Sequence, residues 1–315
     1  MSDTTPIQSR AILDANHKSV WSRGPLAGMV ASEVAITVSI ELLARTTELS
    51  LGAILLYRSL LALALAAIIV RPRPADWLPR SPGLASVRLV TGGLTFVGWF
   101  GAIALLSGRV AQAVLLLDAL ILAYVRGERK RYERHTLLFL TASLILFVWL
   151  AVREPGTVLD ARRGILFLLI ALGSRAASYK VWELAQGKGE HLFWLIAPAL
   201  AGGALGGVFL IFSPWTHHRL QPLSPAMWCV MLMVAMVGLT GYFYMNHVMS
   251  LLGAFYTRVV ELWQLPILWM IHLLTEQAHL EWTQGVTAAL VASASAYAYL
   301  RHRKSMNSLL HRPPA

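Results

Sequence analysis

Residues 51–70 read LGAILLYRSLLALALAAIIV, a run of 20 residues whose only charged side chain is Arg58. An α-helix needs about 20 mostly apolar residues to cross the roughly 30 Å hydrocarbon core of a bilayer. This run has that length, and no proline interrupts it. It therefore predicts a transmembrane helix, and it gives a template for searching the rest of the chain.

The composition of the whole chain agrees with a membrane protein. Of its 315 residues, 57% are hydrophobic and only 14% are charged, and the mean hydropathy is +0.59. Soluble domains carry about 25% charged and 45–50% apolar residues, so a soluble enzyme or a basic nucleic-acid-binding domain fits poorly. The apolar content excludes a disordered chain. The single cysteine, Cys229, excludes a disulfide framework and a cysteine-rich metal site.

Ten runs resemble residues 51–70. The first is interrupted by Glu33 and Glu41, and the fourth is short and leads into the basic stretch 126–134. We expect an all-α integral membrane fold of ten transmembrane helices, arranged as two five-helix units over residues 25–152 and 164–300. The runs cover approximately residues 25–44, 51–70, 85–106, 110–125, 136–152, 164–185, 191–213, 226–249, 251–274 and 282–300.

The distribution of basic residues predicts the orientation of the chain. No basic segment leads into a cleavable apolar core, so we expect no signal peptide and a cytoplasmic N-terminal tail, residues 1–24. An even number of spans makes the C-terminal tail, residues 301–315, cytoplasmic too. Of the 27 Lys and Arg residues, 17 then fall in cytoplasmic segments and 6 in outside loops, as the positive-inside rule requires. This pattern suits a bacterial inner membrane.

A weak internal repeat relates the two expected units. A shift of 143 residues places Gly98-Trp99-Phe100 on Gly241-Tyr242-Phe243, and Asp118 on Glu261. Only 8 of the 55 positions over 98–152 are identical, so the repeat depends on the matching acids and span boundaries. A unit with an odd number of spans puts the second half upside down relative to the first, which is the inverted-repeat plan of many transporters.

Several short segments resemble the EamA-type members of the ten-helix drug/metabolite transporter superfamily. They are residues 104–113, 119–124 and Gly127-Glu128-Arg129, with a second copy over 249–276 and Gly285 beyond it. Arg58 lies where such proteins often carry an arginine, whereas Asp118 replaces a proline of the family's fourth helix. The resemblance covers about residues 25–303 and implies a ten-helix transporter of small metabolites.

Arg88, near the start of the run 85–106, is counted with the preceding cytoplasmic loop, and nine other Asp, Glu, Lys and Arg side chains fall within the ten runs. A charge at membrane depth costs several kcal/mol unless it meets a partner or water, so these residues are candidates for function. Glu33 and Arg175 lie at similar depth in spans one and six, which suits a salt bridge or a paired site for a zwitterion. Asp118 is a lone carboxylate at mid-span and could carry a proton. The nine are Glu33, Glu41, Asp118, Glu183, Glu261, Arg58, Arg175, Lys180 and Arg258.

Two pairs among them have helical spacing. Arg258 and Glu261 are three residues apart, as are Lys180 and Glu183, so each pair shares a helix face and can form a salt bridge. Two interpretations stay open: pairing that only makes burial tolerable, or a cavity lining that binds a charged solute. Glu41 and Arg58 lie closer to span ends, where snorkelling to water explains them more simply.

Aromatic residues in spans three and eight are further candidates. Tyr244 and His247 share a helix face, and with Trp99 they could form a hydrogen-bonding cavity wall, although such residues more often pack between helices or lie at the interface. We assign substrate binding to Glu33, Arg175, Arg258, Glu261, Trp99, Tyr244 and His247. Proton coupling is assigned to Asp118 or Glu261.

Span seven contains the small-residue sequence Ala201-Gly-Gly-Ala-Leu-Gly-Gly207. Small residues let helices approach closely, so this stretch favours tight packing within the chain or contact with a second copy. A homo-oligomer is therefore one of the assemblies that the sequence allows.

The sequence lacks the common motifs for nucleotide hydrolysis and metal binding. The chain has no Gly-x-x-x-x-Gly-Lys-Ser/Thr phosphate loop and no His-Glu-x-x-His. His217-His218 has no carboxylate close by, so we expect no metal site and no cofactor. The basic stretch 126–134 suits contact with anionic membrane lipids, and we expect no nucleic-acid partner.

These observations predict a secondary transporter with no catalytic residues. We expect it to export a small polar metabolite, zwitterionic or amino-acid-like, by alternating access about a central site. The alternatives are a membrane-embedded enzyme or lipid-handling protein, which needs an acid or base beside a membrane-facing groove, and a non-transporting subunit of a larger complex, which needs a filled, salt-bridged centre.

Overall fold

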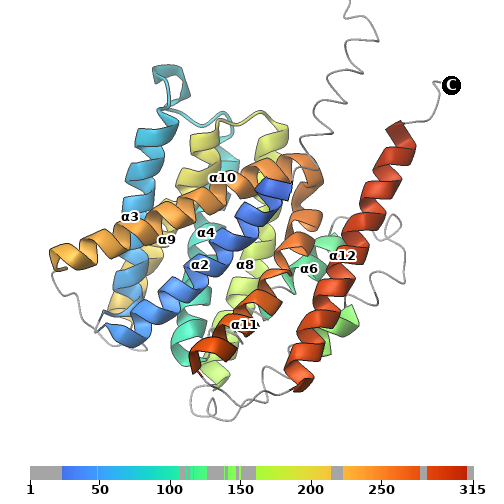
Figure 1. Ribbon diagram of the computed structural model, residues 1–315. Coiled ribbons are helices and arrows are strands. Elements are labelled where there is room, and N and C mark those ends of the chain that lie inside the picture. Colours follow the sequence, from blue (N-terminus) through green and yellow to red (C-terminus); the bar gives the residue numbers. More distant parts are fainter. Residues whose placement is uncertain are drawn as a thin grey trace, which may run out of the picture.

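The computed structural model describes residues 23–47, 49–106, 161–213, 223–276 and 282–310, together with residues 111, 114–115, 117–125, 138, 141–146 and 149. The secondary structure in this part of the chain is helical (Figure 1). The elements are α2 (Arg23–Thr46), α3 (Leu51–Val70), the 3₁₀-helix η1 (Pro74–Asp76), α4 (Pro82–Leu105), α6 (Asp118–Val125), α8 (Ala161–Gly187), α9 (Leu192–Phe212), α10 (Pro225–Glu261), α11 (Gln264–Glu276) and α12 (Trp282–Leu310).

Local signals fix where several of these helices begin and end. The Ser50 side chain accepts a hydrogen bond from the Ala53 backbone N–H at 3.2 Å, and Ser224 caps α10 through Met227 in the same way. Such caps satisfy backbone donors that have no partner within the helix. The helix α3 ends at Arg71, whose backbone is left-handed (φ 46°) and whose N–H donates to the Ala67 carbonyl.

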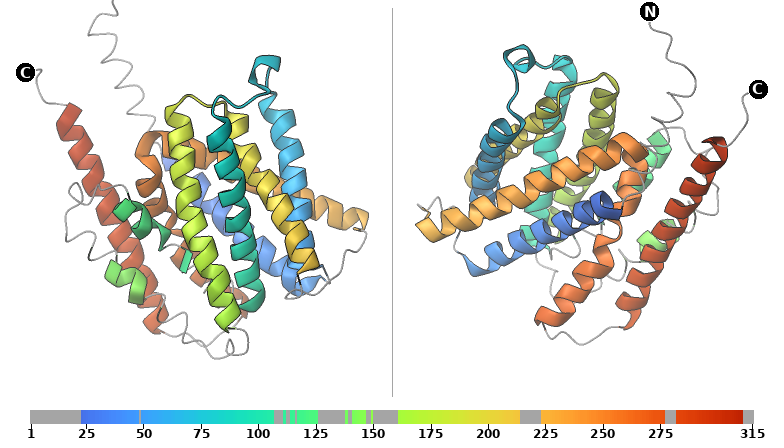
Figure 2. Two further views of the ribbon diagram at one scale, coloured as in Figure 1. Left: turned by 180° about the vertical axis from the view of Figure 1, so that it is seen from behind. Right: turned by 45° about the horizontal axis from the view of Figure 1, so that its top comes forward.

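Four helices form an upright block. In Figure 1 the helices α3, α4, α8 and α9 stand side by side, and Figure 2 shows them from behind. The helix α4 packs against both α8 and α9, and α9 also packs against α3. A Cβ atom placed on Gly202 of α9 would lie 2.1 Å from the Leu89 carbonyl oxygen of α4. The small residues of span seven therefore bring two backbones into direct contact within this chain.

The helices α2 and α10 cross this block at a slant and run beside one another (Figures 1 and 2). Gly28 of α2 faces the ring of Tyr244, and Gly241 of α10 faces Ser32. The helix α10 bends at Gly253, where φ is 75° and ψ is 171°. That backbone conformation is close to exclusive to glycine, so Gly253 turns the end of α10 away from its first part.

Six stretches among the described residues are long and apolar enough to cross a membrane, which is the mark of a membrane protein. They lie in α2, α3, α4, α8, α9 and the continuous stretch Pro225–Ile271 that joins α10 to α11. The described helices therefore support the expectation of a membrane protein, without indicating which membrane.

The prediction of ten transmembrane helices, arranged as two inverted five-helix repeats with both termini cytoplasmic, is wrong. The described residues form nine α-helices, which contain six stretches that meet the length and composition of a span. The expected boundary between the spans 226–249 and 251–274 agrees with the structure, because the non-helical backbone of Gly253 divides α10 into two helical parts. A further break, a turn at Leu262–Trp263, separates α10 from α11 inside the expected span 251–274. A hydropathy search misses this break because it lies in apolar sequence.

Three other expected spans, 110–125, 136–152 and 282–300, differ in how far the described helices match them. Only Asp118–Val125 of the span 110–125 is a described helix. The helix α12 contains the expected span 282–300, but its serines, threonines and tyrosines leave it below the apolarity of the other spans. Most of 136–152 lies outside the described residues, as do residues 1–22 of the expected N-terminal tail 1–24 and residues 311–315 of the expected C-terminal tail 301–315. Residues 301–310 of that tail continue α12.

Candidate functional site

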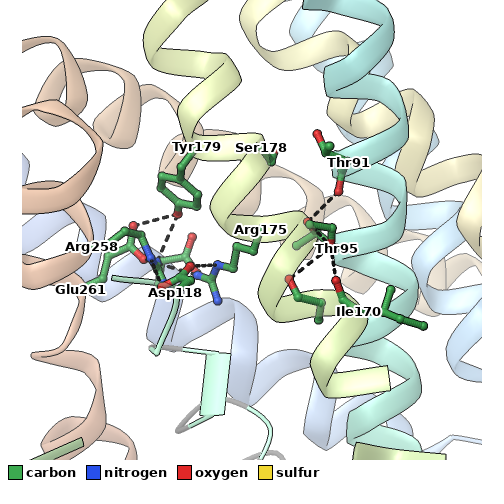
Figure 3. A network of polar contacts seen from close by, with 12 residues as sticks. Thr91, Thr95, Asp118, Ile170, Arg175, Ser178, Tyr179, Arg258 and Glu261 are labelled. Atoms are coloured by element: carbon green, nitrogen blue, oxygen red, sulfur yellow. Dashed lines mark hydrogen bonds and ion pairs between the residues drawn. The ribbon is translucent and has the colours of Figure 1, made fainter. Parts of the chain in front are cut away.

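A network of buried charges joins three helices (Figure 3). Asp118 comes from the start of α6, Arg175 from the middle of α8, and Arg258 and Glu261 from the bent end of α10. Asp118, Arg258 and Glu261 have no exposed surface, and Arg175 is 7% exposed. Charges this deeply buried require close partners, and each of these side chains has at least one of opposite sign.

The contacts in this network are short and shared. Arg258 Nε lies 2.9 Å from Asp118 Oδ1, and Arg258 Nη1 also contacts Glu261 Oε2. Arg175 reaches the same two carboxylates, at 3.5 Å from Asp118 Oδ2 and 3.4 Å from Glu261 Oε2. Two guanidiniums thus enclose two carboxylates, and the group of four is electrically neutral.

Tyr179 completes the network from α8, one turn after Arg175. Its hydroxyl donates to Glu261 Oε1 at 3.0 Å and accepts from Arg258 Nη1 at 3.2 Å. The Arg258 guanidinium also lies over the Tyr179 ring, 4.9 Å from its centroid. Tyr179 therefore positions both members of the Arg258–Glu261 pair.

The sequence interpretation of Asp118 as a lone carboxylate is wrong. Asp118 and Arg258 are 140 residues apart, so no local spacing in the sequence pairs them. The two expected local pairs do form, since Arg258 contacts Glu261 and Lys180 Nζ lies 2.9 Å from Glu183 Oε2. Lys180 and Glu183 are more exposed than the network and stand outside it.

A cavity of about 70 Å³ adjoins the network, between α2, α3, α4, α8 and α10. A water molecule needs about 10–15 Å³ on this measure, so the space holds several waters or part of a small solute. Glu33 lines the cavity from α2, and its Oε2 lies 4.0 Å from Arg175 Nη2, the long salt bridge that the matching depths predict. Arg175 therefore connects the cavity to the buried network.

Two more arginines line the same cavity. Arg58 of α3 is 3% exposed, and its guanidinium lies over the Phe96 ring, 5.2 Å from the centroid. Snorkelling of Arg58 to water is therefore wrong, and Glu41, at 7% exposure, is likewise buried. Arg88 of α4 is 2% exposed and lies over Trp182 at 4.1 Å.

Sequence reasoning missed two site residues, Tyr179 and Arg88. Arg88 was missed because it was counted among the basic residues of a cytoplasmic loop. Its Nη1 donates to the Ser178 carbonyl and hydroxyl, both at 3.0 Å, and its Nε donates to the Leu195 carbonyl at 2.5 Å. Its position three residues inside the expected span 85–106 was the signal available. These bonds tie α4 to α8 and α9 at the cavity wall.

A hydroxyl bridge supports the same α4–α8 contact further along (Figure 3). Thr95 Oγ1 donates to Ser174 Oγ at 3.2 Å, and Ser174 Oγ in turn donates to the Ile170 carbonyl at 2.6 Å. Thr95 also lines the cavity. This wall is thus both polar and held in place by neighbouring helices.

The three aromatic candidates have different positions. Trp99 lines the cavity and is 6% exposed. Tyr244 does not line it and packs instead against Gly28 of α2. His247 is exposed on α10 and also lies away from the cavity. Of the assigned binding residues, Glu33, Arg175 and Trp99 share the cavity wall, while Arg258 and Glu261 lie behind Arg175.

A second, larger hollow of about 960 Å³ runs between α2 and the segment α10–α12. Its described lining residues are mostly aliphatic, with Trp263 and Tyr299 among them, and none of them is a carboxylate, lysine, arginine or histidine. A membrane-embedded enzyme of the expected kind needs an acid or base beside such a groove, and the described residues of this lining do not include one.

Comparison with known proteins adds evidence on the fold. No family model matches the chain, and no curated protein matches it. Solved structures do match, among them a crystal structure of a protein with a TM-score of 0.64 at 15% sequence identity, over 90% of this chain and 99% of that chain. At this identity the likeness concerns the fold alone. The chain is thus a helical membrane protein whose architecture is shared with a known structure.

Proposed function

We propose that the protein is a secondary transporter of a small polar solute that carries charged groups. The observation that supports this most is the position of the cavity, which lies among membrane-spanning helices and is lined by Glu33 together with three arginines. Charged groups at membrane depth are expensive and mark substrate or ion pathways. The resemblance of the sequence to drug/metabolite transporters gives the same functional class.

The proposed class of solute follows from the cavity lining, which contains both a carboxylate and guanidinium groups. Glu33 can bind an ammonium group, and the arginines can bind an acidic group. A zwitterionic, amino-acid-like metabolite meets both requirements, with export across a bacterial inner membrane as the proposed direction and place. No step of this proposal requires bond-making or bond-breaking chemistry, so we propose a transporter and not an enzyme.

Transport is tested with purified protein in proteoliposomes. A panel of radiolabelled anionic, cationic, zwitterionic and neutral solutes is presented to wild type, Glu33→Gln and Arg175→Gln. We expect saturable flux of at least one charged class in wild type and a fall of at least about tenfold in each variant, the cost of losing one charge-assisted contact. Arg162→Gln, an exposed change at the start of α8, is the matched control.

The buried network supports a second candidate, a non-transporting membrane subunit. Asp118, Arg175, Arg258 and Glu261 are buried and neutralise one another, as a purely structural centre would. Absence of flux for every solute class, in protein whose folding is verified, would contradict the transporter and favour this subunit.

A further inference from the structure

Three hydrogen-bond donors on residues that line the cavity have no acceptor within the described part of the chain. They are Nε and Nη1 of Arg58 and Nε1 of Trp99. Arg58 is 97% buried and Trp99 is 94% buried, since their exposures are 3% and 6%. Buried donors are nearly always paired in folded proteins, so these three atoms point to a partner that binds in the cavity. All three are donors, so that partner must supply acceptors.

The structure holds the Arg58 guanidinium in place without using a carboxylate. One face lies over the Phe96 ring. On another side is Gly238 of α10, where an added Cβ would come within 3.0 Å of Arg58 Nη2. The absent side chain at Gly238 therefore makes room for the guanidinium. Arg58 differs in this respect from Arg175, whose guanidinium has carboxylates of Glu33, Asp118 and Glu261 within 4.0 Å.

The charges around the cavity have a positive surplus. Arg88 donates only to neutral groups, namely the Leu195 carbonyl and the Ser178 carbonyl and hydroxyl. Among the described residues, the cavity and the network together contain four guanidiniums and three carboxylates, which leaves one positive charge. The four are Arg58, Arg88, Arg175 and Arg258, and the three are Glu33, Asp118 and Glu261.

We infer that Arg58 and Trp99 form the subsite for a carboxylate group of the transported solute. A carboxylate carries two acceptor oxygens and the one negative charge that the surplus requires, and it accepts well from a guanidinium. This inference rests on the proposed function and moves the acid-binding role from Arg175, whose charge is already used by three carboxylates, to Arg58. The rings of Phe96 and Trp99 and the side chain of Ile36 offer an apolar surface to the rest of the solute.

Butyrate and butyramide have nearly the same shape and differ in charge, so they test whether the subsite requires a negative charge. Radiolabelled butyrate is bound to purified protein in detergent micelles, and unlabelled butyrate or unlabelled butyramide is added as competitor. The measured quantity is the ratio of the two competitors' affinities. We expect wild type to prefer butyrate by at least about tenfold, the value of a hydrogen bond to a charged group. Arg58→Gln should bring the ratio close to one, Arg58→Lys should keep most of it, and Arg162→Gln should leave it unchanged. A ratio near one in wild type, or an unchanged ratio in Arg58→Gln, would overturn the subsite.

A second variant covers the case in which Arg58→Gln does not fold. Trp99→Phe keeps an aromatic ring and removes only the indole N–H, so it should lower the butyrate preference about threefold at an unchanged melting temperature. An unchanged preference in a folded Trp99→Phe protein would contradict the role of Trp99.

Flux is measured separately in proteoliposomes, so that failure of the subsite and failure of transport can be distinguished. Charge-selective binding without flux would refute transport and keep the subsite. Flux without charge-selective binding would refute the subsite alone.

Discussion

Arg258 and Asp118 meet at 2.9 Å in the interior of the protein although 140 residues separate them in the chain. Arg258 is placed by the bend of α10 and Asp118 by the first turn of α6. Neither side chain has exposed surface, and the same two helices contribute two of the acids that Arg175 of α8 contacts. The pair therefore links α6 and α10 by charge, and Arg175 adds α8, at a depth where water does not screen these contacts.

Removing one member of this pair should cost much more stability than removing a member of a more exposed pair. We expect Asp118→Asn to lower the free energy of unfolding by about 3–5 kcal/mol, because the buried guanidiniums of Arg175 and Arg258 then share only Glu261 and one positive charge is uncompensated. Lys180→Gln, which breaks the part-exposed pair with Glu183, should cost at most about 1 kcal/mol. Thermal unfolding in detergent measures both losses. Equal losses would contradict the claim that the buried Asp118–Arg258 pair contributes more stability than the part-exposed Lys180–Glu183 pair.

Adding a methyl group at Gly202 should separate α4 from α9. The new Cβ would lie 2.1 Å from the Leu89 carbonyl oxygen and 2.8 Å from the Gly93 nitrogen, and backbone atoms cannot move aside as a flexible side chain can. We expect Gly202→Ala to destabilise the protein by about 1–3 kcal/mol. Gly173→Ala on α8, where a Cβ meets nothing within 4 Å, should be neutral or slightly stabilising in the same melting experiment.

The bend at Gly253 should not tolerate a side chain. At φ 75° and ψ 171° an L-residue is strained, so Gly253→Ala should lose about 1–3 kcal/mol or straighten α10. Straightening would move Arg258 and Glu261 away from Tyr179, and flux should fall together with the melting temperature. A variant with wild-type stability and flux would show that the bend does not position these residues.

Proton coupling is predicted to depend on the network acids and not on the acid at the cavity. Asp118 and Glu261 are enclosed by Arg175 and Arg258, so proton exchange there requires the arginines to separate, as a change of conformation would cause. We expect Asp118→Asn and Glu261→Gln to flatten the pH profile of flux in proteoliposomes. Glu33→Gln should lower flux at every pH and keep the shape of the profile. A pH profile unchanged in Asp118→Asn would remove the coupling role.

Helical content, membrane character and local ion pairs follow from the sequence because each depends on nearby residues. Residues 51–70 form a helix from the expected first residue to the expected last, and Arg258 contacts Glu261 at the predicted spacing. The number of spans was not predictable, because the turn at Leu262–Trp263 lies in apolar sequence that hydropathy reads as uniform. The bend at Gly253, by contrast, coincides with the expected boundary between the spans 226–249 and 251–274.

Which arginines line the cavity could also not be predicted from the sequence. Arg88 and Arg58 each had a simple explanation, as a loop charge and as a snorkelling side chain. Their burial depends on tertiary neighbours such as Phe96, Trp182 and Gly238, which come from other helices or from distant turns. Only the packed structure distinguishes an arginine that reaches water from one that faces an internal cavity.

The order in which the ribosome makes the chain gives Arg175 a further importance. Asp118 is synthesised 140 residues before Arg258, which at about 5–20 residues per second is a delay of roughly 7–28 s. During that time a carboxylate destined for the protein interior lacks the partner that it contacts most closely. Arg175, whose Nε lies 3.5 Å from Asp118, is made less than halfway through the interval. It gives the newborn protein a cation for Asp118 before the last helices leave the ribosome, so the first stable intermediate during membrane insertion should already contain α8.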